Sequence, residues 1–338
     1  MLQLIGRLLG WLRGGTLNLL AIGLVILLVW GITSPVGTLV WWLGEGAESL
    51  GLRKNKPKNL LTPTNNTTSL PQKVNDNNKT CYIIFLPGVG DFSADELTPG
   101  ETYFLNRLLQ LHPNCVVVSD VFPYSAANTS LGGGRPLAKF WQFANDATGW
   151  LGGAEVLIKI RNLWRFAISV DSRYGPVYNQ GIANAIIERM NAQNAMPQNP
   201  KKPIKIVLIG TSGGVQVSLG AATYLKKWIN SEIFVVSIGG VFDGNHGFEA
   251  ANYVYHLKGK RDLIEDIGGI IFASRWSWVV GSPFNQARLR NKYTEQISGP
   301  HAHDGEEGYF GENVAKSPDI TYVQLTVKEV EKLPFWQP

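Results

Sequence analysis

The sequence has few residues in the spacings that bind metals or nucleotides. It contains only two cysteines among 338 residues, Cys81 and Cys115, and these are too far apart for the paired Cys-x-x-Cys spacing of structural zinc sites. Its glycine-rich turn at residues 210–214 lacks the Gly-Lys-Ser/Thr ending of a P-loop. These absences argue against a zinc module and against a P-loop nucleotide-binding protein.

A long basic patch is also missing. The net charge is only +5, and the lysines and arginines do not gather into a run interleaved with aromatic residues, as a nucleic-acid groove requires. Nucleic acid is therefore not an expected partner. Hydrophobic residues, by contrast, make up 44% of the chain, so it is neither disordered nor fibrous and can bury a large core.

One long segment near the N-terminus lacks charge altogether. No charged residue occurs from Gly14 to Gly44, and Leu17 to Trp30 is almost wholly aliphatic, close to the roughly 20 apolar residues that span a bilayer. Trp41 and Trp42 suit the membrane interface. Because no Ala-x-Ala-like cleavage site follows, an uncleaved transmembrane anchor over residues 1–52 is favoured over a secretory signal peptide. The expected localisation is therefore the membrane.

The chain then changes composition twice. Residues 53–80 are rich in Asn, Thr, Lys and Pro, which predicts a flexible polar tether. From Cys81 to the C-terminus, apolar β-branched runs alternate with helical patterns. The expected strands cover residues 82–86, 116–118, 204–209, 233–238, 253–257 and 293–297, and the expected helices cover 99–111, 181–190, 215–228 and 320–332.

This alternation predicts an α/β domain over residues 81–338, with a mostly parallel sheet flanked by helices. Two segments interrupt the pattern, at residues 132–170 and 263–284. Both are expected as insertions above the carboxyl ends of the strands, where such sheets bind ligands. Cys81 and Cys115 each open an expected strand. If these strands are parallel neighbours, the cysteines can form a disulfide; two buried free thiols are the open alternative.

The stretch Gly210-Thr211-Ser212-Gly213-Gly214 follows a buried strand and opens a helix. This is the setting of a nucleophile elbow, in which small residues on both sides of the serine let strand and helix approach closely. The tight turn then presents the Ser212 hydroxyl at the helix N-terminus. A simple tight turn without catalytic chemistry is the alternative interpretation.

In this context the chain from about Cys81 onward resembles the α/β-hydrolase superfamily, whose catalytic residues follow in the order Ser, acid, His. The resemblance implies Asp262 as the acid, in Gly259-Lys260-Arg261-Asp262, with Asp243 as the alternative position. It implies His303 as the base, in the loop "SGPHAHDGEEGYFG", with His301 as the competing candidate. It also implies that the first two strands of the family are absent, because the tether leads directly into the third.

The same resemblance implies an oxyanion hole. One donor is the backbone N–H of Gly213, directly after the nucleophile. The other is the N–H of Val89 in "FLPGVGDF", where Pro87 occupies the place of the family's usual histidine and leaves the backbone donor intact. No cofactor is expected.

The loop with the two histidines near the C-terminus could also bind a metal, since its side chains include residue types that act as metal ligands: His301, His303, Asp304 and Glu306. The His-x-His-x-Asp-His order of metallo-hydrolases is not met, however, because position 305 is glycine. No metal is therefore expected.

The sequence thus predicts a membrane-tethered serine hydrolase that cleaves a carboxylic ester or thioester through an acyl-enzyme on Ser212. The expected substrate is a small-molecule or lipid acyl compound, since tryptophans in the insertions and a membrane anchor favour an apolar group. An acyltransferase with the same triad, and a non-catalytic module of this fold that binds at the membrane, are the alternatives.

Overall fold

The computed structural model describes residues 79–90, 97–125, 153–197, 202–315 and 319–337, without the side chains of residues 153–158. All of them belong to the second of the two units into which the chain divides, Thr67–Pro338. The expected anchor and nearly all of the expected tether lie outside the described residues. None of the described helices is both long enough and apolar enough to cross a membrane.

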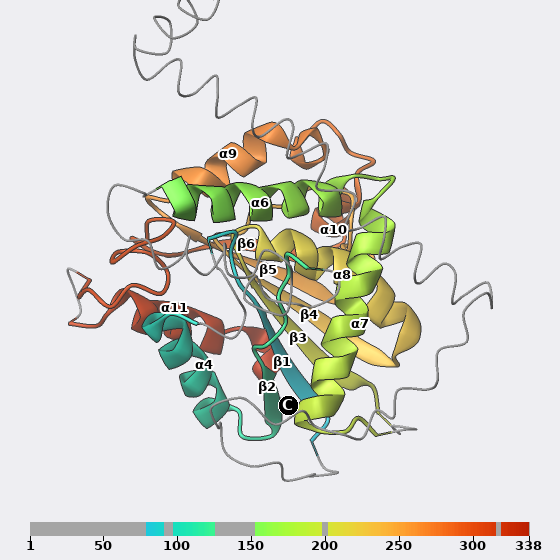
Figure 1. Cartoon of the computed structure of the whole chain (residues 1–338), viewed down its shortest axis with the longest axis horizontal. Coiled ribbons are helices and arrows are strands. Elements are labelled where there is room, and N and C mark those ends of the chain that lie inside the picture. Colours follow the sequence, from blue (N-terminus) through green and yellow to red (C-terminus); the bar gives the residue numbers. More distant parts are fainter. Residues whose placement is uncertain (1–78, 91–96, 126–152, 198–201, 316–318, 338) are drawn as a thin grey trace, which may run out of the picture. The chain divides into compact units, whose positions relative to one another are not determined.

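The described strands form one six-stranded sheet in which every neighbouring pair is parallel (Figure 1). The spatial order is β2-β1-β3-β4-β5-β6. The strands are β1 (Cys81–Leu86), β2 (Cys115–Val118), β3 (Ile204–Thr211), β4 (Ser231–Ile238), β5 (Tyr253–Gly259) and β6 (Tyr293–Gly299). The predicted parallel sheet flanked by helices is therefore confirmed.

Helices cover both faces of this sheet. They are α4 (Pro99–Leu111), α6 (Gly153–Val170), α7 (Gly175–Gln193), α8 (Gly214–Trp228), α9 (Leu263–Ile271), α10 (Pro283–Leu289) and α11 (Tyr322–Glu331). Two starts are fixed by capping boxes, Thr98 with Glu101 for α4 and Thr321 with Gln324 for α11. Helix α7 begins six residues before the expected range because Pro176 is favourable in a first turn.

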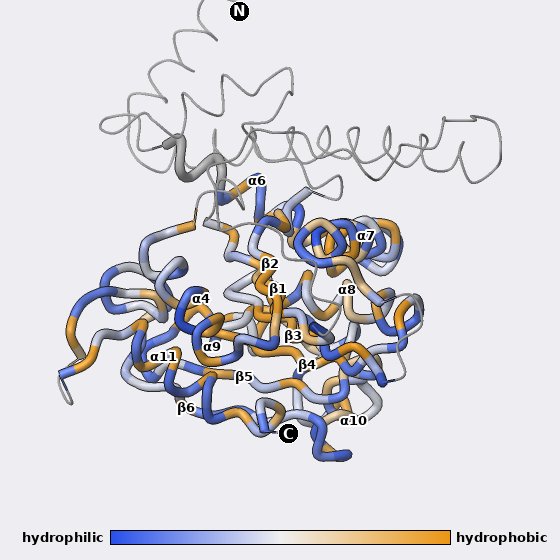
Figure 2. Tube along the Cα trace, turned by 90° about the horizontal axis from the view of Figure 1, so that it is seen from below, coloured by the Kyte–Doolittle hydropathy of each residue, from blue (hydrophilic) through white to orange (hydrophobic). Residues whose placement is uncertain are grey.

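The central strands are apolar on both faces because both faces are covered. All six residues of β1 are buried. Alternate residues point to opposite sides of a strand, so Tyr82 and Ile84 join the core under α7 and α8, while Ile83 and Phe85 join the core under α4 and α11. Figure 2 shows the resulting apolar strands at the centre of the domain. This double burial explains why these strands read as continuous apolar runs.

The disulfide predicted as one of two alternatives is present. Cys81 and Cys115 face each other in the register of β1 and β2, with their Cα atoms 4.4 Å apart, and their sulfur atoms are bonded. The bond joins the edge strand β2 to its neighbour β1 inside the sheet. It closes a loop of 34 residues that includes α4.

The described parts of the two insertions lie together at one end of the sheet. Helix α6 comes from the first insertion and α9 from the second, and in Figure 1 both lie at the same end of the sheet. The rings of Phe166 on α6 and Phe272 at the end of α9 are 6.0 Å apart. Because α9 begins just after β5 ends, this is the carboxyl end of the strands.

Candidate active site

Ser212 occupies a strained turn between β3 and α8. Its φ angle is +48°, in the left-handed region that a non-glycine residue rarely adopts. The flanking glycines are required by close packing. A Cβ on Gly210 would lie 2.7 Å from the Cα of Val215, and one on Gly214 would lie 2.2 Å from the carbonyl oxygen of Leu86. Ser212 is thereby held at the tip of a sharp turn at the start of α8.

Three side chains from distant parts of the sequence meet at this turn. The Nε2 atom of His303 lies 2.9 Å from the Oγ atom of Ser212. On the other side of the ring, Nδ1 of His303 lies 2.9 and 3.0 Å from the two carboxylate oxygens of Asp262. The structure thus brings together the serine, the acid and the histidine that the resemblance indicated.

The carboxylate determines which ring nitrogen of His303 carries the proton. An ionised carboxylate can only accept hydrogen bonds, so Nδ1–H of His303 donates to Asp262 and leaves Nε2 as an acceptor. The Ser212 hydroxyl therefore donates to Nε2. This is the direction of proton transfer that a serine nucleophile needs.

Asp262 is ionised and held from four directions. Besides His303 it accepts the backbone N–H groups of Ile264 and Glu265, both at 3.0 Å, and the hydroxyl of Tyr309 at 2.7 Å. Burial alone would raise the pKa of Asp262, but the hydrogen bond and charge of His303, together with the Glu265 amide and the Tyr309 hydroxyl, lower this pKa below its usual value. The amide bonds also make Asp262 the N-cap of α9.

Tyr309 links this carboxylate to the sheet. Its hydroxyl accepts the backbone N–H of Gly259 at 2.7 Å while donating to Asp262, and its side chain is buried. Burial first, and then the charge of Asp262, raise the pKa of Tyr309 well above its ordinary value, so it stays a donor. In sequence, Tyr309 lies in the loop that carries His303, but no pattern in the sequence pointed to this contact.

The two residues expected to supply the oxyanion donors, Gly213 and Val89, are packed against each other. A Cβ added to Gly213 would lie 2.9 Å from a methyl carbon of Val89. Within the described residues, the backbone N–H groups of Gly213 and Val89 donate no hydrogen bond. Neither amide is therefore engaged by another backbone carbonyl of the described residues, as a free oxyanion donor requires.

Side chains hold the loop that carries Val89. The side-chain amide of Asn162 on α6 donates to the carbonyl oxygen of Val89 at 2.9 Å. The hydroxyl of Tyr124 donates to the carbonyl oxygen of Pro87 at 3.0 Å. These bonds fix the Pro87–Gly88 and Val89–Gly90 peptide groups, which lie on either side of the peptide that carries the Val89 N–H. Neither supporting residue was singled out by its sequence pattern.

The alternative residues make their hydrogen bonds elsewhere. His301 is fully buried, with Nδ1 3.2 Å from the Ser298 hydroxyl and Nε2 3.1 Å from the carbonyl oxygen of Tyr322, and burial lowers its pKa. Asp243 contacts Nδ1 of His246 at 3.2 Å, and this hydrogen bond raises the pKa of His246. Among the described residues, no group of three or more acidic, histidine or cysteine side chains is arranged to hold a metal ion.

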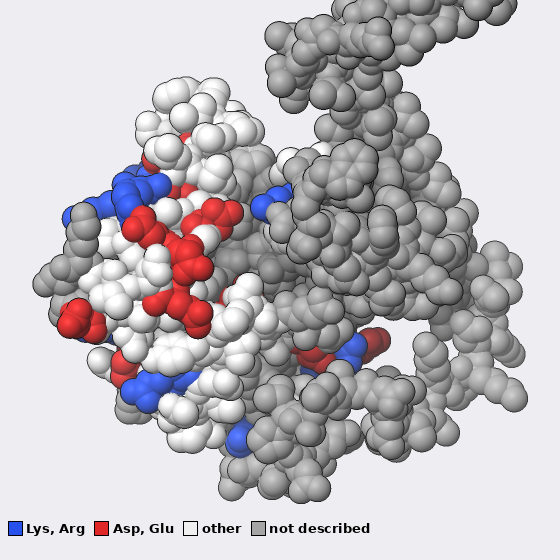
Figure 3. All heavy atoms as spheres, turned by 60° about the vertical axis from the view of Figure 1, so that its left-hand side comes forward, with Lys and Arg blue, Asp and Glu red and all other residues white. Residues whose placement is uncertain are grey.

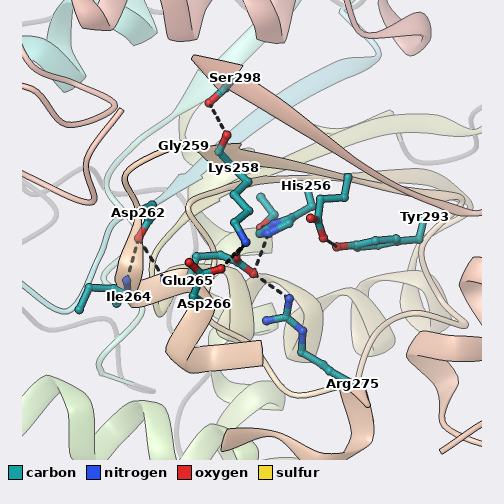
Figure 4. A network of polar contacts seen from close by, with 12 residues as sticks. His256, Lys258, Gly259, Asp262, Ile264, Glu265, Asp266, Arg275, Tyr293 and Ser298 are labelled. Atoms are coloured by element: carbon teal, nitrogen blue, oxygen red, sulfur yellow. Dashed lines mark hydrogen bonds and ion pairs between the residues drawn. The ribbon is translucent and has the colours of Figure 1, made fainter. Parts of the chain in front are cut away.

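A second polar cluster lies directly behind the acid (Figure 4). Glu265, whose backbone N–H donates to the Asp262 carboxylate, is buried, and one of its oxygens lies 2.8 Å from Arg275 and 3.1 Å from His256. Its other oxygen lies 2.8 Å from Nζ of Lys258. Burial alone would raise the pKa of Glu265, but His256, Lys258 and Arg275 lower it far below the ordinary range. Sequence analysis did not find this cluster.

Charged groups on the outside of the domain are mixed in sign. Figure 3 shows acidic side chains gathered on one face, with lysine and arginine at their margins. Arg261, beside the acid in sequence, is part of such an arrangement, because it pairs with Glu307 at 2.6 Å rather than with Asp262. This face is therefore not a continuous basic surface.

Comparison of the chain with protein-family models and with curated proteins found no match. The assignment of the site therefore depends on the geometry of Ser212, His303 and Asp262 and on the parallel α/β fold that positions them.

Proposed function

We propose that this protein is a serine hydrolase of the α/β-hydrolase type that cleaves a carboxylic ester or thioester. The observation that carries the proposal is the continuous chain of hydrogen bonds from Ser212 through His303 to Asp262, at 2.9 Å for each step. The positive φ of Ser212 and its place at a helix N-terminus support it, since strained backbone is found preferentially at functional sites.

In the first half-reaction the Ser212 Oγ attacks the substrate carbonyl carbon and passes its proton to Nε2 of His303. The carbonyl electron pair moves to oxygen, where the amides of Gly213 and Val89 donate to it. When the tetrahedral intermediate collapses, the bond to the alcohol or thiol breaks, and His303 returns the proton to this leaving group. Water then repeats these steps on the acyl-enzyme and releases the acid.

Asp262 accepts the Nδ1–H bond throughout and stabilises the imidazolium without taking the proton. Its lowered pKa fits this role, because the carboxylate must stay ionised while the ring beside it becomes charged. Tyr309 and the start of α9 keep the carboxylate in place.

Covalent labelling with a fluorophosphonate tests the nucleophile directly. We expect the full chain to be labelled and the Ser212→Ala variant to lose labelling completely. Ser218→Ala is the matched control: its hydroxyl is buried on the same helix, bonded to the carbonyl oxygen of Gly214 at 2.9 Å, and this variant should label normally. Unchanged labelling of Ser212→Ala would refute the proposal.

A further inference from the structure

Helix α9 exposes an apolar face immediately beyond the candidate site. Seven large apolar side chains between residues 263 and 280 are 45% to 71% exposed. They are Leu263, Ile264, Ile267, Ile270 and Ile271 on the helix, with Trp278 and Val280 after it. We call this set the α9 face. Contiguous exposed patches of this kind mark binding surfaces in soluble domains.

The helix is oriented opposite to an ordinary surface helix, which turns its apolar side inward. The buried residues of α9 are Glu265 and Gly268. Figure 4 shows how the charged one is held: Glu265 points inward to Arg275, His256 and Lys258. The guanidinium of Arg275 also lies over the ring of Phe242, 4.2 Å from its centroid. A buried ionic cluster therefore fixes the apolar side outward.

The segment after α9 continues the same surface. The indole N–H of Trp276 donates to the carbonyl oxygen of Ile270 at 3.0 Å, which satisfies a group at the helix end. The ring of Trp276 lies 4.9 Å from that of Trp278, which is 71% exposed. Tryptophan is enriched where apolar side chains meet the polar layer of a membrane.

The form of the α9 face suits a lipid bilayer. The helix has nine residues and is therefore only about 14 Å long. A short amphipathic helix of this kind can lie in a bilayer interface with its apolar side down.

The N-terminal part of the sequence also favours a lipid bilayer as the surface that contacts the α9 face. The sequence predicts a bilayer-spanning segment within the charge-free stretch from Gly14 to Gly44. Residues 45–78 connect this stretch to the described domain, and a chain of that length can reach at most roughly 110 Å, well beyond the roughly 20 Å length of the six-residue strand β1. The chain can therefore reach from a membrane to β1 and still let the opposite end of the sheet face that membrane.

From these observations we propose that the α9 face inserts into the interfacial layer of a lipid bilayer and brings the candidate site to acyl groups there. Insertion of the α9 face into the bilayer does not depend on whether the protein is a hydrolase. Only the choice of acyl lipid as the substrate rests on the proposed function. Phe272, at the end of α9, contacts Phe166, and Phe166 in turn lies against Gly213 at the nucleophile. Two packed aromatic rings therefore connect the end of α9 to the turn that carries Ser212.

A site-directed fluorophore tests the contact. Because Cys81 and Cys115 are bonded to each other, a cysteine introduced at position 278 is the only free thiol. The full-length Trp278→Cys variant is labelled with a nitrobenzoxadiazole dye and reconstituted into phosphatidylcholine vesicles, with or without lipid carrying a nitroxide on its acyl chain. We expect the nitroxide lipid to reduce the emission at position 278 at least about twofold.

Trp228→Cys is the matched control. Trp228 is also an exposed tryptophan, but it ends α8 just before β4 begins and so lies at the amino end of the sheet. Its label should be quenched far less. Adding Ile270→Asp and Ile271→Asp, both at exposed positions, should abolish the quenching at position 278.

Equal quenching at positions 278 and 228 would overturn the proposal. So would a label at position 278 that iodide in solution cannot reach but the lipid nitroxide does not quench, since a protein would then cover the α9 face. The Ser212→Ala variant must keep the quenching. If the chain with Ser212 intact were not labelled by the fluorophosphonate while the label at position 278 was still quenched, the hydrolase would be refuted and the membrane contact would stand.

Discussion

At the scale of single residues, Asp262 has two tasks that one substitution can separate. Its carboxylate accepts Nδ1–H of His303 and also caps α9 through the amides of Ile264 and Glu265. Asparagine is as good an N-cap as aspartate, but it presents an amide whose NH₂ group can donate to the ring. The variant Asp262→Asn therefore keeps the helix and disturbs the tautomer of His303.

For Asp262→Asn we expect the rate of ester hydrolysis to fall on the order of 10⁴-fold, the effect of placing the histidine in the wrong tautomer. The free energy of unfolding should change by less than about 1 kcal/mol, because the cap is retained. Steady-state kinetics and urea unfolding of the same preparation give both numbers. A variant that keeps more than a tenth of the activity would contradict the role assigned to Asp262.

A second prediction for a single residue concerns the hydroxyl of Tyr309. Tyr309→Phe removes the donor to Asp262 and leaves the buried N–H of Gly259 without its acceptor. We expect a loss of about 1–3 kcal/mol in the free energy of unfolding. Tyr322→Phe is the control, because its hydroxyl accepts only from the exposed Arg261, and it should cost less than about 1 kcal/mol. Equal losses in the two variants would argue against the buried role of Tyr309.

Functional residues that lie within one short sequence motif were the easiest to predict. Ser212 lies in a local motif whose glycines are required because a side chain would collide with neighbouring backbone. The structure confirms this close packing at Gly210 and Gly214. His303 and Asp262 needed the resemblance, since nothing local distinguishes them from His301 and Asp243. Tyr309 and Asn162 were missed because each acts through one contact with a residue distant in sequence.

At the scale of elements, the ionic cluster around Glu265 decides how α9 is placed. Glu265 and Arg275 have side chains that are only 3% and 6% exposed, and they are 2.8 Å apart. Removing one partner of such a pair leaves the other charge buried without compensation, which costs about 3–5 kcal/mol. We therefore expect Glu265→Gln to lower the free energy of unfolding by that amount near neutral pH, as measured with urea.

The double variant Glu265→Gln/Arg275→Met distinguishes a charge effect from a packing effect. Because it removes both charges, it should recover part of the stability lost in Glu265→Gln. A double variant less stable than the single one would show that Arg275 acts mainly through its contact with Phe242.

The same element predicts a pH dependence. Glu265 has a lowered pKa in the folded domain, against 4.5 for an unperturbed group, so the unfolded chain binds its proton first as the pH falls. The stabilisation by Glu265 is complete above about pH 4.5 and is lost as the pH falls through the lowered folded value. The stability gap between wild type and Glu265→Gln should therefore be constant from pH 7 to pH 5 and shrink below pH 4. A gap that widens on acidification would contradict this sign.

The helix and strand ranges were mostly predictable because their signals are local. Helix α4 was expected at residues 99–111 and occupies Pro99–Leu111. The outward placement of α9 was not predictable, since an apolar run such as "LIEDIGGII" ordinarily turns inward. Its orientation depends on Arg275, His256 and Lys258, which reach Glu265 only after the sheet has formed.

At the scale of the whole molecule, the alternation of strands and helices was sufficient to predict the parallel sheet. The strand order follows from connections through helices on both faces, but the sequence pattern does not specify it. The pairing of β1 with both β2 and β3 places Cys81 beside Cys115. The disulfide is therefore a consequence of topology that the positions of the cysteines only suggested.

This bond gives a prediction for the complete domain. It closes a loop of 34 residues, and loop-closure entropy of the unfolded chain then stabilises the folded state by about 4 kcal/mol. We expect Cys115→Ser to lose about that much in urea unfolding. The double variant Cys81→Ser/Cys115→Ser should be about as unstable as the single one, because either change removes the same bond. The unreduced chain, unfolded in denaturant, should show no free thiol in a titration with a thiol reagent. Two free thiols in that titration would exclude the bond.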